Sequence, residues 1–213
     1  MTVEEYFGDW IDVINRRELS KIIRWLSTVD DNFLCPSKRN IFKAFTSCPY
    51  KQCNVVCLGQ DPYPQPGVAT GILFGNRAET PEHLLSPSLK VVKRAVGASD
   101  AFDNTMESWS KQGILMINTA LTCIQNRIGS HVNMWRPFIS SLVESISINR
   151  PDMIFFLFGS QAKSFLPYIH GNPVVSENHP AYYARFGTNM PETTFNLVNS
   201  ILESKGKPKI DFA

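Results

Sequence analysis

Four short apolar runs alternate with helical patterns along this chain, and that alternation restricts the fold more than any other feature. Each run has the length and composition of a buried parallel strand, and the runs lie at residues 54–58, 114–118, 153–158 and 173–176. Helical periodicity follows them at residues 88–96, 135–148, 161–169 and 193–204. Strands alternating with helices predict the α/β class, with a central, mostly parallel four-stranded sheet flanked by helices.

The length of 213 residues is that of one ordinary domain, and we expect a single domain over residues 1–213. Residues 1–50 have the apolar spacing of helices, which we expect to pack on the α/β core. A hydrophobic share of 43% with 19% charged residues is typical of a folded, soluble protein rather than a disordered one. The basic tail at residues 205–209 follows the last helix, and we interpret it as a solvated terminus.

The net charge and the cysteine content limit which binding partners and which cellular compartment we expect for this protein. The net charge of +2 is too small to imply nucleic acid by itself, so an anionic partner must be bound by a local face and by backbone amides. No apolar stretch approaches a membrane span, and the acidic N-terminus lacks the basic start of a secretory signal. The five cysteines form no CxxC pair, which predicts reduced, structural thiols in a cytoplasmic protein and no metal site.

Polar groups follow each of the four apolar runs where the strand is expected to end. They are, in order, Gln60 and Asp61, then Asn118, then Gly159 and Ser160, then Asn178 and His179. Open α/β sheets bind their ligands beyond the carboxyl ends of the strands. This edge of the sheet is therefore the predicted site.

A stiff loop, Gly59-Gln60-Asp61-Pro62-Tyr63-Pro64-Gln65-Pro66-Gly67, follows the first run. Its prolines fix φ, so Asp61 and Tyr63 are held rigidly, although an Asp-Pro pair alone is more typical of a turn or helix cap. His179 is stiffened by Pro180 and shares the edge with Asp61. A lone histidine is usually a surface residue, but in this company His179 is a candidate acid, base or electrophile.

Two residues suit a flat heteroaromatic ligand. Phe74 can serve as a stacking platform, although core packing is the commoner role of a lone phenylalanine. Asn118 presents one acceptor and one donor, as a pyrimidine edge requires, although asparagine at a strand end is also a common cap. Short loops carry hydroxyl groups that suit phosphate oxygens or, in the first two cases, a helix N-cap: Ser86, Ser88 and Ser130.

These segments, in this order, resemble the signature of the family 1 uracil-DNA glycosylases. The matching blocks are Gly59-Gln60-Asp61-Pro62-Tyr63 with Gly67, Ala69, Gly71 and Phe74, Ser86-Pro87-Ser88-Leu89-Lys90, residues 112–122, Gly129-Ser130-His131, residues 156–159 and His179-Pro180. Residues 41–45 also look like the segment before the family's first strand. The first and third blocks together are highly specific, and the match runs from about residue 35 to the C-terminus.

The resemblance implies an enzyme of base excision repair that extrudes deoxyuridine from DNA and hydrolyses its N-glycosidic bond. It implies that Phe74 stacks on the uracil, Asn118 binds the N3 and O4 edge, and the Gln60 backbone amide binds O2. Tyr63 would stand against C5 and exclude the methyl group of thymine.

For the chemistry, the resemblance implies that Asp61 orients water and stabilises the oxocarbenium-like sugar, while His179 donates to O2 as the base departs. It implies no metal and no cofactor, a monomer acting on single- or double-stranded uracil-containing DNA, and a possible proteinaceous inhibitor as partner. DNA contacts would come from Pro62, Ser86, Ser88, Ser130 and Tyr183.

The chain departs from the family pattern at four positions. Pro64 replaces a histidine, Val68 a glutamine, Ala181 a phosphate-gripping serine, and Tyr183 the leucine wedge that enters the duplex. These changes concern DNA handling, so two alternatives stay open: a glycosylase with altered lesion choice, and a catalytically weak DNA-binding or replication scaffold of the same fold. A generic nucleotide-binding protein is disfavoured, since no GxGxxG or Walker pattern follows the first run.

Overall fold

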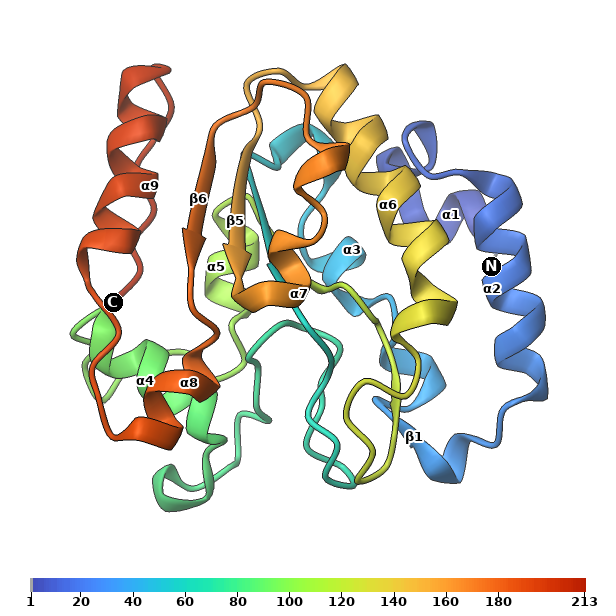
Figure 1. Cartoon of the computed structure of the whole chain (residues 1–213), viewed down its shortest axis with the longest axis horizontal. Coiled ribbons are helices and arrows are strands. Elements are labelled where there is room, and N and C mark those ends of the chain that lie inside the picture. Colours follow the sequence, from blue (N-terminus) through green and yellow to red (C-terminus); the bar gives the residue numbers. More distant parts are fainter. Residues whose placement is uncertain (1) are drawn as a thin grey trace.

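A parallel sheet of four strands lies at the centre of the computed structural model, which describes residues 2–213 (Figure 1). Its spatial order is β3 (Ile114–Asn118), β2 (Val55–Gly59), β5 (Ile154–Phe158) and β6 (Val174–Glu177). Each neighbouring pair is parallel, so the four carboxyl ends meet at one edge. The predicted α/β class and the four predicted strands are confirmed.

Alternate side chains of the strands enter two hydrophobic clusters, one on each face of the sheet. Val56 and Leu58 of β2 belong to one cluster, whereas Val55 and Cys57 belong to the other. The first is closed by α2 (Arg16–Thr28), α3 (Lys43–Ser47) and α6 (Val132–Asn149). The second is closed by α4 (Pro87–Ala95), α5 (Glu107–Lys111) and α9 (Thr193–Ser204). Burial on both faces explains why the strands read as continuous apolar runs.

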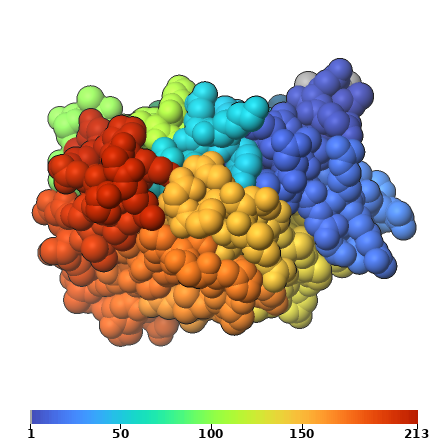
Figure 2. All heavy atoms as spheres, turned by 90° about the horizontal axis from the view of Figure 1, so that it is seen from above, coloured from blue at the N-terminus to red at the C-terminus, as the bar shows by residue number. Residues whose placement is uncertain are grey.

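The N-terminal segment begins with α1 (Val3–Phe7) and packs through α2 against the first cluster. Trp10 is fully buried there, and its indole N–H donates to the Cys48 carbonyl oxygen at 2.7 Å. The Asp9 carboxylate accepts hydrogen bonds from the backbone of the loop that leads into β2. Figure 2 shows this segment at one end of the molecule and α9 at the other, with α6 between them.

Several short elements are absent from the sequence-based prediction. A two-residue ribbon pairs β1 (Leu34–Cys35) with β4 (Cys123–Ile124), and helix α8 (Pro180–Phe186) begins directly after His179. The helix predicted at 161–169 is divided into α7 (Gly159–Lys163) and a 3-10 turn, because Pro167 has no N–H to continue an α-helix. The 3-10 helices lie at Gly8–Asp12, Asp31–Phe33, Lys38–Asn40, Tyr50–Gln52, Glu82–Leu84 and Leu166–Tyr168.

The basic residues 205–209 are largely exposed, as their composition predicts, but the chain that follows them packs on the core. Ile210 and Phe212 are buried in the second cluster, and the Phe212 ring lies 4.9 Å from that of Trp109. The Lys207 ammonium pairs with the Asp152 carboxylate, so one of the three tail lysines neutralises an acid on the core. The basic composition of residues 205–209 gives no sign of the two apolar residues that follow. Burial of Ile210 and Phe212 holds this segment against the second cluster.

Three further properties follow from the coordinates of residues 2–213. No helix among them is long and apolar enough to cross a membrane. No group of three or more His, Cys, Asp or Glu side chains in the same range is placed to hold a metal ion. All five cysteines are buried, and none of them forms a disulfide bond within residues 2–213.

Candidate active site

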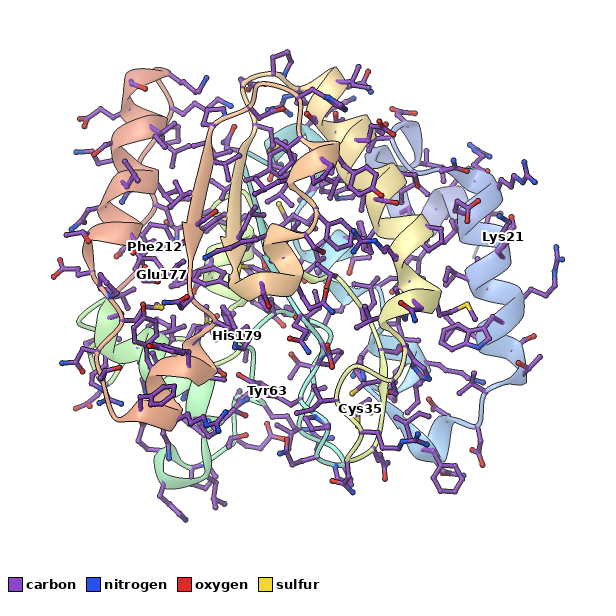
Figure 3. All side chains as sticks on the ribbon, in the orientation of Figure 1. Lys21, Cys35, Tyr63, Glu177, His179 and Phe212 are labelled. Carbon is purple, nitrogen blue, oxygen red and sulfur yellow. The ribbon has the colours of Figure 1, made fainter. Side chains whose placement is uncertain are left out.

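A pocket opens at the carboxyl edge of the sheet, and it brings together the residues predicted to act on the base. Its empty space, including the open mouth, is about 440 Å³. In Figure 3, Tyr63 and His179 lie near one another at this edge. The lining consists of Ile41, Asp61, Pro62, Tyr63, Ala69, Thr70, Gly71, Ile72, Leu73, Phe74, Asn118, Leu121 and His179.

Asn118 ends β3 beside Gly59, its partner in β2. A Cβ atom at Gly59 would lie 2.6 Å from Asn118 Oδ1 and 2.3 Å from Leu73 Cδ1, so only glycine leaves the amide its place. Asn118 is 8% exposed, and its Oδ1 has no hydrogen-bond partner in the described part of the chain. An unpaired buried acceptor costs free energy, and an N–H group of a ligand would remove that cost.

The two carboxylate oxygens of Asp61 have different surroundings. Oδ2 accepts a hydrogen bond from the Gly129 backbone N–H, whereas Oδ1 is buried without a partner among residues 2–213. Burial raises the pKa of Asp61 above its ordinary value, against the lowering effect of the Gly129 N–H and the Gln60 side chain. One oxygen is thus anchored, and the other is available to hold a water molecule or face a cation.

Phe74 and Tyr63 are fixed to each other before any ligand binds. The Tyr63 hydroxyl donates to the Phe74 carbonyl oxygen at 3.1 Å, and burial raises the pKa of Tyr63, which keeps this donor protonated. Phe74 has a φ of 63°, a left-handed conformation that is uncommon outside glycine and clusters at functional sites. The centroid of its ring lies 5.2 Å from that of the Phe158 ring and 5.7 Å from that of the His179 ring, and both pairs are edge-on.

His179 is the N-cap of α8, and its Nδ1 atom accepts from the Ala181 backbone N–H at 3.2 Å. Burial lowers the pKa of His179 to about 4, so the imidazole is neutral at neutral pH. Because Nδ1 acts as an acceptor, the single proton of the neutral ring resides on Nε2. The side chain can therefore donate one hydrogen bond without carrying charge.

A family model that describes the uracil DNA glycosylase superfamily matches residues 45–203. The chain belongs to the uracil DNA glycosylase superfamily. A uracil-DNA glycosylase of Fusobacterium nucleatum is 31% identical over 215 residues, covering 96% of this chain and 95% of the relative. One from Coxiella burnetii is 31% identical, covering 99% and 89%. The resemblance predicted from the motifs is confirmed.

Solved structures of uracil-DNA glycosylases share the fold. The crystal structure of mimivirus uracil-DNA glycosylase matches with a TM-score of 0.74 at 21% identity, covering 100% of this chain and 93% of that one. The enzyme from Nitratifractor salsuginis matches with a TM-score of 0.63 at 19% identity, covering 91% and 90%. A variant of the mimivirus protein in complex with UGI gives a TM-score of 0.75 at 20% identity, covering 99% and 94%.

Most of the DNA contacts expected from the uracil DNA glycosylase resemblance lie outside the pocket. Pro62 lines it, but Ser86 and Ser88 are buried at the start of α4. The Ser86 backbone N–H and hydroxyl are both held by the Asn76 amide, at 2.7 and 2.9 Å. Ser130 is exposed, and its Oγ atom accepts from the backbone N–H of Ile124 at 2.8 Å. The DNA-binding roles of these residues stay predictions.

Tyr183, in the position of the family's wedge, points inward in this structure. It is 8% exposed, and its hydroxyl donates to Glu177 Oε1 at 2.6 Å. The exposed aromatic rings of α8 are instead Tyr182, at 49%, and Phe186, at 60%, with centroids 4.8 Å apart. The segment after His179 forms helix α8, which places Tyr183 in the second hydrophobic cluster, and its role as a wedge stays a prediction.

Three groups that position predicted site residues were not predicted from the sequence. The Gly129 amide holds Asp61, Gly59 leaves space for Asn118, and Asn76 orients Ser86. The two glycines lie within motifs of the uracil DNA glycosylase signature, so their presence was visible although their task was not. No pattern identifies Asn76, since its role depends on a contact between two loops.

Proposed function

We propose that this protein hydrolyses the N-glycosidic bond of deoxyuridine in single- or double-stranded DNA, releasing uracil and leaving an abasic site. The observation that carries the proposal is a pair of buried acceptors in one pocket, Asp61 Oδ1 and Asn118 Oδ1, neither of which has a hydrogen-bond partner within residues 2–213. Asn118 Oδ1 would accept from the edge of the base, and Asp61 Oδ1 would hold the water molecule or face the sugar cation. Membership of the uracil DNA glycosylase superfamily supports hydrolysis of the glycosidic bond as the reaction that these groups carry out.

The pocket would read the uracil ring by shape and by its edge. Asn118 Oδ1 is suited to accept from N3–H, and the amide nitrogen to donate to O4. Phe74, locked by its edge-on contacts, would stack on the ring. Tyr63, tied to Phe74, would occupy the space beside C5 that the thymine methyl group needs.

The glycosidic bond would break with positive charge developing on the sugar and negative charge on the base. The Asp61 carboxylate would stabilise the sugar cation and orient the water that attacks it. The neutral His179 would donate from Nε2 to uracil O2, and the Gln60 backbone amide would donate to the same oxygen. A neutral donor suits this step, since it stabilises the anion without having to lose a proton.

DNA handling is assigned to the loops around the pocket. Pro62, Ser86, Ser88 and Ser130 would meet the phosphate backbone, and an aromatic side chain of α8, with Tyr183 in the wedge position, would fill the vacated stack. We propose that residues 1–213 act as one monomeric domain in the cytoplasm. The complex of a mimivirus relative with UGI supports a proteinaceous inhibitor as a further partner.

The test is abasic-site formation on an oligonucleotide with one uracil, in single- and double-stranded form. Parallel substrates carry thymine, hypoxanthine or a 5-substituted uracil. Cleavage restricted to uracil supports the proposal. Preference for another base would establish altered lesion choice, and DNA binding without cleavage would establish the scaffold alternative.

A further inference from the structure

Two buried thiols lie against the loop that carries Asp61, residues 60–66, which we term the catalytic loop. Cys35 of β1 and Cys123 of β4 are directly opposite one another in the antiparallel ribbon. Such partners extend from the same face of a ribbon, so both thiols face the same neighbour. Cys123 Sγ lies 3.5 Å from the Pro62 carbonyl oxygen, and Cys35 Sγ lies 3.5 Å from that of Pro64. Figure 3 labels Cys35 at the same edge as Tyr63.

The catalytic loop depends on donors from outside itself. Pro62, Pro64 and Pro66 have no N–H, but their carbonyl groups still require hydrogen bonds when buried. Pro64 also accepts from the Asn126 backbone N–H at 2.9 Å. For the Pro62 carbonyl, the Cys123 thiol is the only donor in the described part of the chain. The residue that follows Asp61 is therefore held through sulfur.

Both thiols remain donors over the whole working pH range. A cysteine donates only while it is protonated, and burial raises the pKa of Cys35 and raises that of Cys123 to about 12. Their side chains are 2% and 0% exposed, which also removes competition from water. Neither thiol lines the pocket or contacts the base site directly.

We propose that Cys35 and Cys123 are positioning residues, which fix the Pro62 and Pro64 carbonyls and thereby the carboxylate of Asp61. The inference rests on the proposed glycosylase function. Asp61 precedes the first anchored carbonyl, and its Oδ2 is held from the other side by Gly129. The contacts from Cys123, Cys35 and Gly129 therefore restrict where the free Oδ1 points. Displacement of a reacting group by a fraction of an ångström is enough to slow an enzyme severely.

The experiment compares Cys123→Ala with Cys123→Ser, which differ by one hydroxyl donor, in single-turnover cleavage of a single-stranded uracil oligonucleotide. Cys123→Ala should lower the maximal rate roughly three- to tenfold with a nearly unchanged half-saturating concentration, and Cys123→Ser should restore most of the rate. Cys35→Ala should have a smaller effect, since Pro64 keeps its bond from Asn126. The matched control is the pair Cys48→Ala and Cys48→Ser, whose thiol is equally buried away from the catalytic loop.

A second measurement separates positioning from simple loss of packing. In an Asp61→Asn background, Cys123→Ala should cause no further slowing, because the carboxylate it positions is gone. Equal rates for the Ala and Ser variants, an equal loss at Cys48, or a multiplicative loss in the Asp61→Asn background would overturn the inference. If the unsubstituted protein releases no uracil, the proposed function fails and the inference fails with it. If the unsubstituted protein cleaves and Cys123→Ala cleaves at the same rate, the proposed function stands and the inference fails.

Discussion

The base pocket and helix α8 adjoin at His179, but they hold their side chains by different means. In the pocket, each group is set by the end of a strand or by a contact to one, as the Gly59–Asn118 register shows. In α8, a seven-residue helix, the inward face is held by packing of Tyr183 in the second cluster and by the bond from Tyr183 to Glu177. Although burial alone would raise it, the pKa of Glu177 is lowered by donors that include Tyr183.

This difference separates what the two regions can do without DNA. The pocket has unpaired acceptors and a strained Phe74, so its groups are arranged for a ligand before it arrives. In helix α8 the Tyr183 hydroxyl is already bonded to Glu177 of β6, and the neighbouring rings of Tyr182 and Phe186 are exposed. The pocket is therefore preorganised for the base, whereas α8 offers a surface.

The largest effect is expected at Asp61. Asp61→Asn keeps the shape of the side chain but removes the charge that opposes the sugar cation, so single-turnover cleavage should fall by about 10²–10³ or more. Binding of the uracil oligonucleotide should persist, as measured by fluorescence anisotropy. The matched control is Asp103→Asn, whose carboxylate bonds to Thr105 and Ser108 away from the pocket. Full turnover by Asp61→Asn would sink the assignment of Asp61.

The sequence predicts the pocket better than it predicts the orientation of α8. Asp61, Asn118 and His179 could be placed together because they follow apolar runs, and parallel strands bring their ends to one edge. The side-chain direction of Tyr183 could not, since alignment with a family position does not say which face of a short helix turns outward. The position of Phe212 could not be predicted for a similar reason, since it follows the basic residues 205–209 and only the folded core shows the space that it fills.

The next effect concerns the edge of the base. In Asn118→Asp, the carboxylate can accept from the exocyclic amine of cytosine, whereas it cannot donate to O4 of uracil. Uracil release should fall by about 10–100-fold, and slow release of cytosine from duplex DNA should appear. Matched oligonucleotides with one uracil or one labelled cytosine give both rates. Unchanged, uracil-only activity would refute the edge-reading role of Asn118.

The acid limb of the pH profile should belong to Asp61 rather than to His179. Burial raises the pKa of Asp61, so activity falls as pH drops through a value above that of an ordinary carboxyl group. The pKa of His179 is lowered to about 4, so the ring is neutral at neutral pH, and a protonated ring would still donate from Nε2. At pH values below the pKa of Asp61, the rate should fall about tenfold per pH unit, because one carboxylate must be ionised.

Single-turnover rates from pH 4 to 8 measure this limb. It should persist in His179→Asn, at a lower absolute rate, and vanish in Asp61→Asn. A limb that disappears with His179 and survives the loss of Asp61 would reverse the two assignments.

The smallest effect is expected on α8, where it decides which ring meets the duplex. Stacking of a base on an aromatic ring contributes about 1–3 kcal/mol, and an exposed ring on a preformed surface is expected to give the low end of that range. Tyr182→Ala should therefore slow duplex cleavage by about fivefold and leave single-stranded cleavage unchanged. Tyr183→Ala should slow both substrates alike, because it removes the anchor to Glu177 that orients the helix. A loss confined to the duplex in Tyr183→Ala would instead show that Tyr183 leaves its buried place and acts as the wedge.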